Sequence, residues 1–403
     1  MSSSDSFTRL STSCARGPAR VESASPPLVS PLELSAVYCP ADLDHVDALS
    51  EGRSKGFIYA RDGHPNAAQL AEKLAHLEGG DGALICASGM GAIASVFLSL
   101  LSQNDHALIS DGVYGKTTSL VTRLLPRWGI DHDIFDPAAG PATLKSLLKP
   151  ETRLIYTETA SNPLLKVADL DSMAVVARQA GIPLIVDNTF TPVICRPIDH
   201  GASLVVHSVT KMIGGHSDLT LGAVVGAKNL VEQAKVIAST LGQTGNPFES
   251  WLALRGMATL CLRFKRACDS SLELARRFES DGRVVRVYYP GLKSHPDHEL
   301  ALRILKDGFG AIVTIDLGSR SNAQTFIKAL DGIPFAPSLG DVQTTLSHPT
   351  TTSHRGQDDA QLARQAITPG MIRISVGIED AGDLWREFSH ALGALKVAPA
   401  LRP

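Results

Sequence analysis

The segment Ala83-Leu-Ile-Cys-Ala-Ser-Gly-Met-Gly-Ala-Ile-Ala94 runs from an apolar strand through a turn of small residues into a helix. This pattern is typical of α/β folds, in which helices cover a sheet. Amides at the start of such a helix can bind phosphate, because small side chains let the anion approach closely. Strand-to-helix turns are often rich in Gly and Ser for structural reasons alone. The segment therefore indicates the fold class and leaves phosphate binding open.

The same turn also fits a dinucleotide site. Gly89, Gly91 and Ala94 match the pattern G-x-G-x-x-A, and Asp111 follows the next apolar run about 20 residues on. A dehydrogenase that uses a nicotinamide cofactor is therefore an alternative hypothesis.

Around this segment, short apolar runs alternate with helical stretches, which predicts a mostly parallel sheet covered by helices. The predicted strands are Ala83 to Cys86, His106 to Ser110, Arg153 to Thr157, Ile182 to Asp187, Ser203 to His207 and Gly222 to Gly226. A helix is predicted from Asn66, with Gln69 completing its cap, to Leu77, before Gly79-Gly80. After Pro247 a long helical region extends to about Ser280. It is followed by a smaller α/β unit with strands Arg283 to Tyr289, Ala311 to Leu317 and Met371 to Gly377.

These patterns divide the chain of 403 residues into three parts. Residues 1–55 form an N-terminal arm, of which Met1 to Pro31 is rich in Ser, Pro and Arg and is expected to be flexible unless a partner surface holds it. Residues 56–260 form the large domain, and residues 261–403 form the small C-terminal domain. The boundary is expected within the long helical region.

Composition narrows the class of protein. Charged residues make up 20% and the formal net charge is −3, which favours neither nucleic acid nor an anionic membrane as partner. No apolar run reaches the ~18 residues of a membrane span. The six cysteines form no C-x-x-C pair, so reduced thiols in a cytoplasmic protein are expected. The histidines show no metal-binding spacing, and no metal is expected.

Two polar clusters follow neighbouring predicted strands: Val186-Asp-Asn-Thr-Phe190 and Ser208-Val-Thr-Lys-Met-Ile-Gly-Gly-His-Ser217. Open α/β sheets bind ligands at these carboxyl ends of their strands. Lys211 can form a Schiff base with an aldehyde cofactor, and Asp187 can keep a pyridine nitrogen of that cofactor protonated. The predicted cofactor is therefore pyridoxal 5'-phosphate (PLP). The structural alternative is that Asp187 caps a helix and Lys211 lies on the surface.

Five segments occur in a characteristic order: Tyr59-Ala-Arg61, Ser88-Gly-Met90, Val186 to Phe190, Ser208 to Lys211 and Arg373-Ile-Ser-Val-Gly-Ile-Glu-Asp380. Together they resemble the cystathionine γ-synthase and γ-lyase family of PLP enzymes, from about residue 50 to residue 395. The resemblance implies PLP fold-type I: a large domain with a mostly parallel, seven-stranded sheet and a smaller C-terminal α/β domain. It also implies a small amino-acid substrate and at least a homodimer, more specifically a homotetramer with shared active sites.

The resemblance further implies a role for each matching residue. Lys211 would carry PLP and move protons, Asp187 would pair with the pyridine nitrogen, and Tyr114 would stack on the ring. Phosphate contacts would come from Ser88, Gly89, Met90, Ser208 and Thr210, and from Tyr59 and Arg61 of a neighbouring subunit. Arg373 would bind the substrate α-carboxylate, with Asn162 and Ser338 orienting the groups around it. Each has a structural alternative, such as a core aromatic, a helix cap or a paired arginine.

Such a site can perform γ-replacement, γ-elimination or β-elimination. Lys116 stands where methionine γ-lyases carry Cys, and Gln343 where many cystathionine-binding members carry Glu. The segment His348-Pro-Thr-Thr-Thr-Ser-His354 resembles the homoserine sulfhydrylases. The expected reaction is therefore that of an O-acylhomoserine with a thiol, giving cystathionine or homocysteine in transsulfuration and methionine biosynthesis. A cystathionine γ- or β-lyase is the alternative within the family.

Overall fold

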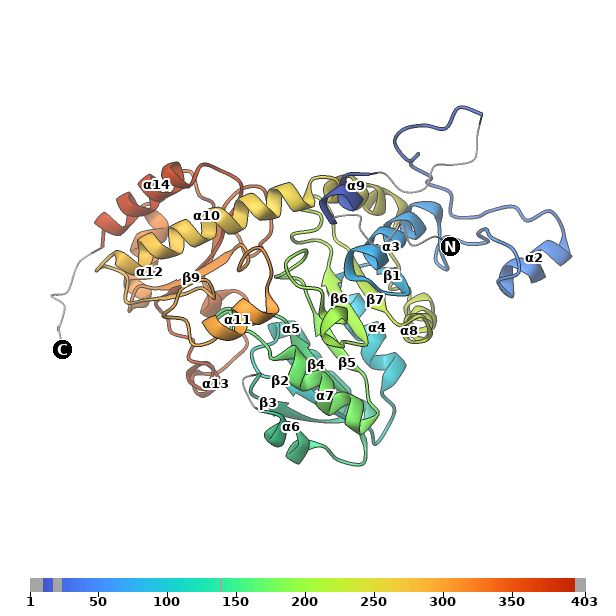
Figure 1. Cartoon of the computed structure of the whole chain (residues 1–403), viewed down its shortest axis with the longest axis horizontal. Coiled ribbons are helices and arrows are strands. Elements are labelled where there is room, and N and C mark those ends of the chain that lie inside the picture. Colours follow the sequence, from blue (N-terminus) through green and yellow to red (C-terminus); the bar gives the residue numbers. More distant parts are fainter. Residues whose placement is uncertain (1–9, 17–23, 138–139, 396–403) are drawn as a thin grey trace.

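The computed structural model describes residues 10–16, 24–137 and 140–395, which form two β-sheets with helices around them (Figure 1). The larger sheet has the strand order β1-β7-β6-β5-β4-β2-β3, and all its strands are parallel except β7, which is antiparallel to both of its neighbours. The smaller sheet, of order β10-β11-β9-β8, is antiparallel. The α/β class and the mostly parallel, seven-stranded sheet are confirmed.

The strands are β1 (Gly82–Cys86), β2 (His106–Ser110), β3 (Asp131–Phe135), β4 (Thr152–Glu158), β5 (Leu184–Asp187), β6 (Leu204–Ser208), β7 (Gly222–Gly226), β8 (Arg286–Tyr288), β9 (Ile312–Asp316), β10 (Thr345–Ser347) and β11 (Met371–Ser375). The α-helices are α1 (Leu10–Ala15), α2 (Leu43–Ser50), α3 (Pro65–Glu78), α4 (Gly89–Leu100), α5 (Gly115–Ser119), α6 (Pro141–Leu147), α7 (Leu170–Ala180), α8 (Lys228–Leu241), α9 (Pro247–Met257), α10 (Leu260–Ser280), α11 (His298–Ile304), α12 (Arg320–Lys328), α13 (Asp359–Arg364) and α14 (Ala381–Gly393). Shorter helical turns are η2 (Leu120–Leu124), η3 (Leu125–Trp128), η4 (Pro197–His200) and η5 (Pro349–Thr351).

Helices cover both faces of the larger sheet. Neighbouring residues of a strand point to opposite faces, so each strand contributes to two cores. On β6, Val206 belongs to the core shared with α4 and α8, whereas Val205 belongs to the core shared with α3 and α7. All five of β7's residues and most of those of β4, β5 and β6 are buried. Burial on both faces explains why these strands appear in the sequence as continuous apolar runs rather than as alternating patterns.

Two strands were absent from the sequence prediction. The edge strand β3 has the sequence Asp-His-Asp-Ile-Phe and is largely accessible to solvent, so it lacks the apolar run that marks the central strands. The other, β10, has three residues and precedes the His348 segment. The predicted strands of the small domain all occur, although β8 is shorter than predicted.

Helix α3 begins differently from the prediction. Its N-cap is His64, whose Nδ1 accepts a hydrogen bond from the Ala67 amide at 3.1 Å, and Pro65 occupies the first helical position. The predicted cap, Asn66, instead accepts a bond from the Glu33 amide and donates one to the Pro31 carbonyl. Asn66 therefore holds the N-terminal segment against α3. The predicted end at Gly79 is confirmed by its left-handed backbone, with φ of 77°.

Part of the predicted flexible arm packs on the chain itself, so the expectation that a partner surface must hold it is wrong for α1. Cys14 is buried, and α1 contacts α3 and α10. The ammonium of Lys73, on α3, donates to the Ser13 and Cys14 carbonyls at 2.9 and 3.0 Å, which satisfies free carbonyls at the end of α1. Residues 1–9 and 17–23 of the predicted arm lie outside the described residues.

The long helical region after Pro247 is a pair of helices, α9 and α10, that meet at Ala258 and Thr259. Figure 1 shows α10 extending from the larger sheet to the smaller one. Arg263, buried near the start of α10, donates to the carbonyls of Met212 and Ile213 at 3.1 and 3.2 Å. It thereby fixes the loop that follows β6. The domain boundary within this region stays a prediction.

Candidate active site

Parallel pairing brings three polar residues to one edge of the larger sheet. Glu158 on β4 lies beside Asp187 on β5, and Ser208 ends β6, the next strand. This edge opens into a cavity of about 670 Å³. The predicted site residues that line it are Ser88, Gly89, Met90, Tyr114, Asn162, Asp187, Ser208, Thr210, Lys211, Ser338 and Arg373. Residues far apart in sequence are thus gathered as the motifs predicted.

One end of the cavity is formed by the first turn of α4. Ser88 is the N-cap, and its hydroxyl accepts from the Gly91 amide at 3.0 Å, so the helix-cap alternative applies to this side chain. Gly89 and Met90 are the first two residues of α4, so their backbone amides have no partner within the helix and are available to an anion. A Cβ on Gly89 would lie 2.8 Å from the Ser208 Cβ, so only glycine allows this close approach. These features fit a phosphate group.

The two predicted hydroxyls at this end differ. The Thr210 hydroxyl donates to the Leu221 carbonyl at 3.1 Å and accepts from the Leu221 amide at 3.0 Å. Its proton is therefore engaged by the backbone. Ser208 lies against Gly89, and within the described part of the chain its hydroxyl has no such bond. Ser208 is the better donor to a phosphate, and Thr210 chiefly holds the loop in place.

Lys211 also lines the cavity. Its ammonium donates to the Ser338 hydroxyl at 3.0 Å. Burial, and secondarily the charge of Arg373, lowers the pKa of Lys211. Lys211 lines the cavity and is only partly exposed, so the surface alternative does not hold. In the described ranges it forms no ion pair. A buried amine without a carboxylate partner is suited to covalent bonding with an aldehyde.

Asp187 closes β5 at the inner wall of the cavity. One carboxylate oxygen accepts from the Thr189 amide at 2.9 Å, and the other lies 3.4 Å from the Tyr156 hydroxyl. Loss of hydration raises the pKa of Asp187, while the bonds from Thr189 and the charge of His207 act in the opposite direction. A protonated ring nitrogen bound here would compensate for that lost hydration, so the carboxylate fits the predicted pyridine partner.

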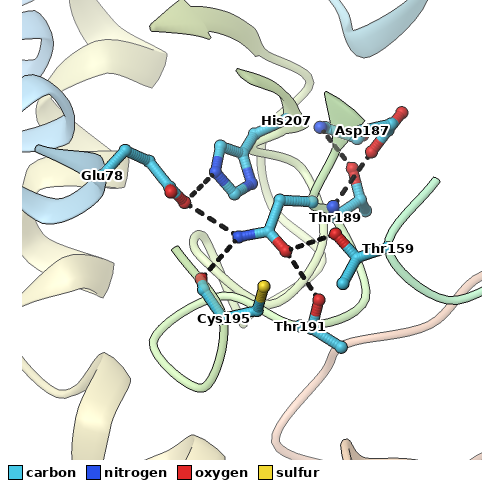
Figure 2. Close-up of polar contacts among 9 residues, drawn as sticks. Glu78, Thr159, Asp187, Thr189, Thr191, Cys195 and His207 are labelled. Atoms are coloured by element: carbon cyan, nitrogen blue, oxygen red, sulfur yellow. Dashed lines mark hydrogen bonds and ion pairs between the residues drawn. The ribbon is translucent and has the colours of Figure 1, made fainter. Parts of the chain in front are cut away.

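A buried network holds the residue that follows Asp187 (Figure 2). The Asn188 amide donates to Glu78 Oε1 and to the Cys195 carbonyl, at 3.0 and 2.9 Å, and Glu78 Oε1 lies 2.6 Å from Nε2 of His207. The Asn188 oxygen accepts from the hydroxyls of Thr159 and Thr191 at 2.9 and 2.6 Å. Since every hydrogen-bonding position of the Asn188 side-chain amide is used, the backbone beside Asp187 is rigidly fixed. His207, which the sequence did not assign to the site, belongs to this supporting network.

Arg373, on β11, lies wholly inside the protein at 4% exposure. Its guanidinium donates to Asn162 Oδ1 at 3.1 Å and to the Ser338 carbonyl at 3.0 Å. Among the described residues no carboxylate pairs with it, contrary to the structural alternative of a paired arginine, and burial lowers its pKa to about 10. A buried, unpaired guanidinium is costly unless an anion binds it, and a carboxylate is its best geometric match.

Tyr114 forms a cavity wall and remains 41% exposed. Its backbone amide donates to Glu158 Oε1 at 2.5 Å. Burial, together with the charge of Asp187, raises the pKa of Glu158. The sequence analysis missed Glu158, although a carboxylate at the end of a buried strand, four residues before Asn162, is a signal that could have identified it.

Tyr59 and Arg61 do not reach this cavity within one chain. The Arg61 guanidinium lies over the Tyr59 ring, 5.3 Å from its centre, and Arg61 lines a separate cavity of about 490 Å³. Their role in a neighbouring subunit stays a prediction. Lys116 and Gln343 are exposed and also lie outside the active-site lining, so neither contacts its contents from the same chain.

Asp111 does not support the dinucleotide alternative. Its carboxylate accepts from the Gly112 amide and from Gln365, and it borders other cavities than the one at Gly89. No cluster with metal-ligand character occurs within residues 10–16, 24–137 and 140–395. In the same ranges no helix is long and apolar enough to cross a membrane.

Comparison with known proteins agrees with this geometry. The family model of Cys/Met metabolism PLP-dependent enzymes matches residues 11–393. The chain is 39% identical to an O-succinylhomoserine sulfhydrylase of Pseudomonas aeruginosa, over 85% of each protein. It is also 39% identical to a cystathionine γ-lyase of Bacillus subtilis, over 85% of this chain and 90% of the relative. A crystal structure of cystathionine γ-synthase from Xanthomonas oryzae superposes with a TM-score of 0.90 and 34% identity, covering 96% of this chain and 98% of that one.

These matches exclude the nicotinamide alternative and confirm PLP fold-type I, the PLP cofactor and the transsulfuration class of chemistry. The chain belongs to the family of PLP-dependent enzymes of cysteine and methionine metabolism.

Proposed function

We propose that this enzyme replaces the γ-substituent of an O-acylhomoserine with a thiol, giving cystathionine or homocysteine for methionine biosynthesis. The observation that carries the proposal is the buried, unpaired guanidinium of Arg373 in the cavity that also holds Lys211. An amino acid bound by its α-carboxylate at Arg373 would direct its amine and side chain into this cavity. The His348 to His354 segment and the similarity to an O-succinylhomoserine sulfhydrylase support the acylhomoserine class.

The residues have distinct tasks in this proposal. PLP, when bound, supplies an electron sink that acidifies the carbon bearing the substrate amine. Lys211 attaches the cofactor and moves protons with its amine, whose lowered pKa favours the neutral base. Asp187 would hold the ring nitrogen, and Tyr114 would cover the ring. The amides of Gly89 and Met90 would hold the phosphate, with Ser208 as the main hydroxyl donor, while Ser88 and Thr210 fix the turn and the loop on either side of it. Asn162 and Ser338 orient Arg373.

The proposal includes a cytoplasmic homodimer or homotetramer, in which Tyr59 and Arg61 bind the phosphate in a neighbouring subunit. All six cysteines are free, which agrees with a reducing compartment. The exposure of Tyr59, at 43%, agrees with a contact outside its own chain.

The attachment residue is tested by borohydride reduction of the purified holoenzyme, followed by peptide mass mapping. The PLP label is expected on Lys211. A label on another lysine would refute the assignment of the cavity as the active site.

The reaction is tested by comparing kcat/KM for O-acetyl- and O-succinylhomoserine, each with sulfide or cysteine, against cystathionine and methionine at equal concentrations. The acylhomoserines are expected to give cystathionine or homocysteine at the higher kcat/KM, with slow 2-oxobutanoate release when no thiol is present. The second candidate is a cystathionine lyase, which the equal identity to the Bacillus subtilis γ-lyase favours. Faster release of pyruvate from cystathionine than of any product from an acylhomoserine would establish a β-lyase instead.

A further inference from the structure

Arg355 is a cation of the active-site cavity without a partner. Its side chain is exposed to the cavity and solvent, and it forms no ion pair or side-chain hydrogen bond within the described parts of the chain. Lys211 and Arg373, the other cations of the lining, each bond to Ser338. Arg355 therefore differs from them in having all its guanidinium donors available to a ligand.

The loop that carries Arg355 is held in place on both sides. His348 lies 2.9 Å from the Pro369 carbonyl, and the Thr352 hydroxyl donates to the His348 carbonyl at 2.9 Å. His354, which directly precedes Arg355, is buried at 2% exposure, and its backbone amide donates a hydrogen bond to the Pro349 carbonyl at 2.9 Å. Arg355 thus projects from an ordered backbone, which lowers the entropy cost of binding an anion.

This loop lies beside the wall formed by Tyr114. A Cβ on Gly115 would collide with the Ser353 carbonyl, so the backbone of the loop packs directly against the turn after Tyr114. Thr351, Thr352 and Ser353 line the cavity together with Arg355. Arg355 is therefore part of the cavity lining, on a loop that packs against the turn after Tyr114.

Within the cavity lining, matching each charged group with a partner leaves Arg355 without one. The acidic residues of the lining are Glu158 and Asp187. They accept hydrogen bonds from the Tyr114 amide and the Thr189 amide, respectively. In the proposed function Lys211 is bonded to PLP, the PLP phosphate is bound at the first turn of α4, and Arg373 binds the α-carboxylate. The cavity then retains one unused cation, and a second anionic group on the substrate would complement it.

We propose that Arg355 binds a carboxylate at the far end of the substrate side chain. This inference rests on the proposed function and narrows its substrate class to dicarboxylic amino acids with a leaving group on the γ-carbon. O-succinylhomoserine has such a carboxylate and O-acetylhomoserine lacks it. Cystathionine also carries a distal carboxylate, so the shared chemistry is the carboxylate, and the experiments below separate its two sources.

The first experiment measures kcat/KM for O-succinyl- and O-acetylhomoserine with Arg355→Gln and Arg355→Lys. A charge-assisted hydrogen bond predicts that Arg355→Gln lowers the succinyl-to-acetyl ratio about tenfold to a hundredfold, mostly through KM. Arg355→Lys should restore part of the ratio, because it keeps the charge and loses the planar fork. Lys116→Gln removes a nearby exposed cation outside the lining and should leave the ratio unchanged. An unchanged ratio in Arg355→Gln would overturn the proposal.

The second experiment measures binding without turnover. L-2-Aminononanedioate reproduces the chain length of O-succinylhomoserine with methylenes in place of the ester, and L-2-aminononanoate lacks its distal carboxylate. Titration of the holoenzyme absorbance should show tighter binding of the dicarboxylate, and Arg355→Gln should remove the difference. Equal binding of the two compounds by the unmodified enzyme would contradict the proposal.

Cystathionine separates the two carboxylate sources. A loss of kcat/KM in Arg355→Gln for O-succinylhomoserine alone assigns the subsite to the acyl carboxylate, and an equal loss for cystathionine assigns it to both. If cystathionine reacts faster than every acylhomoserine, the proposed function fails. The two nonreactive compounds still report on Arg355 in that case, so the two failures are distinguishable.

Discussion

At the scale of single residues, His354 connects the active site to stability. Burial, and secondarily the charge of Arg373, lowers the pKa of His354 from 6.5 to about 4. The unfolded chain therefore binds a proton between these values that the folded chain does not, and stability falls as the pH drops from about 6.5 to 4. The ceiling for this loss is about 3 kcal/mol.

We expect His354→Gln to lose less unfolding free energy over that pH interval than the unmodified holoenzyme does. Urea midpoints at pH 7, 6 and 5 provide the comparison. His390→Gln, which changes an exposed histidine of α14, serves as the control and should follow the unmodified protein. A His354 variant with the same pH dependence as the control would contradict a neutral, buried His354.

At the scale of elements, the first turn of α4 depends on its contact with the end of β6. Gly89→Ala places a methyl group 2.8 Å from the Ser208 Cβ, so we expect a weaker affinity for PLP, by about tenfold or more, with the overall fold retained. Gly82→Ala, on β1, is the matched control because a Cβ there meets nothing within 4 Å. Equilibrium dialysis of PLP measures the effect, and circular dichroism checks the fold. Equal affinities in both variants would exclude a phosphate site at this turn.

The same elements show what the sequence could predict. The apolar runs predicted the strands of the sheet interior. Asp187, Ser208 and Lys211 were predicted because they are polar residues that end or closely follow these strands, and a strand end fixes where such residues lie. The edge strand β3 escaped detection because its Asp and His residues interrupt the apolar run that marks a central strand. Glu158 ends a buried strand in the same way as Asp187 and could have been identified by that pattern. Arg355 was missed because its role depends on which loops pack together, and no local pattern encodes that packing. His64 took the cap expected of Asn66 because Asn66 is occupied by the N-terminal segment.

At the scale of the whole molecule, one chain leaves Tyr59 and Arg61 away from the cavity that holds Lys211. We expect Arg61→Ala and Lys211→Ala to be inactive, or nearly so, when each is alone. After the two variants are mixed and their subunits exchange, part of the activity should return, because a hybrid dimer has one complete site. Native mass spectrometry verifies the exchange. A mixture that exchanges subunits without regaining activity would show that the sites are not shared.

Arg373 and Asn162, which are joined by a hydrogen bond, lie 211 positions apart, so the site is completed in a fixed order during biosynthesis. A protein is made from its N-terminus, and its earlier parts begin to fold first. The residues proposed to hold the cofactor extend only to Lys211, whereas Ser338 and Arg373 are added much later. A nascent chain that has not yet reached β11 therefore contains the residues proposed to hold the cofactor without Arg373, the group proposed to bind an amino acid. With these assignments, the ability to bind a substrate is the last feature of the active site to emerge from the ribosome.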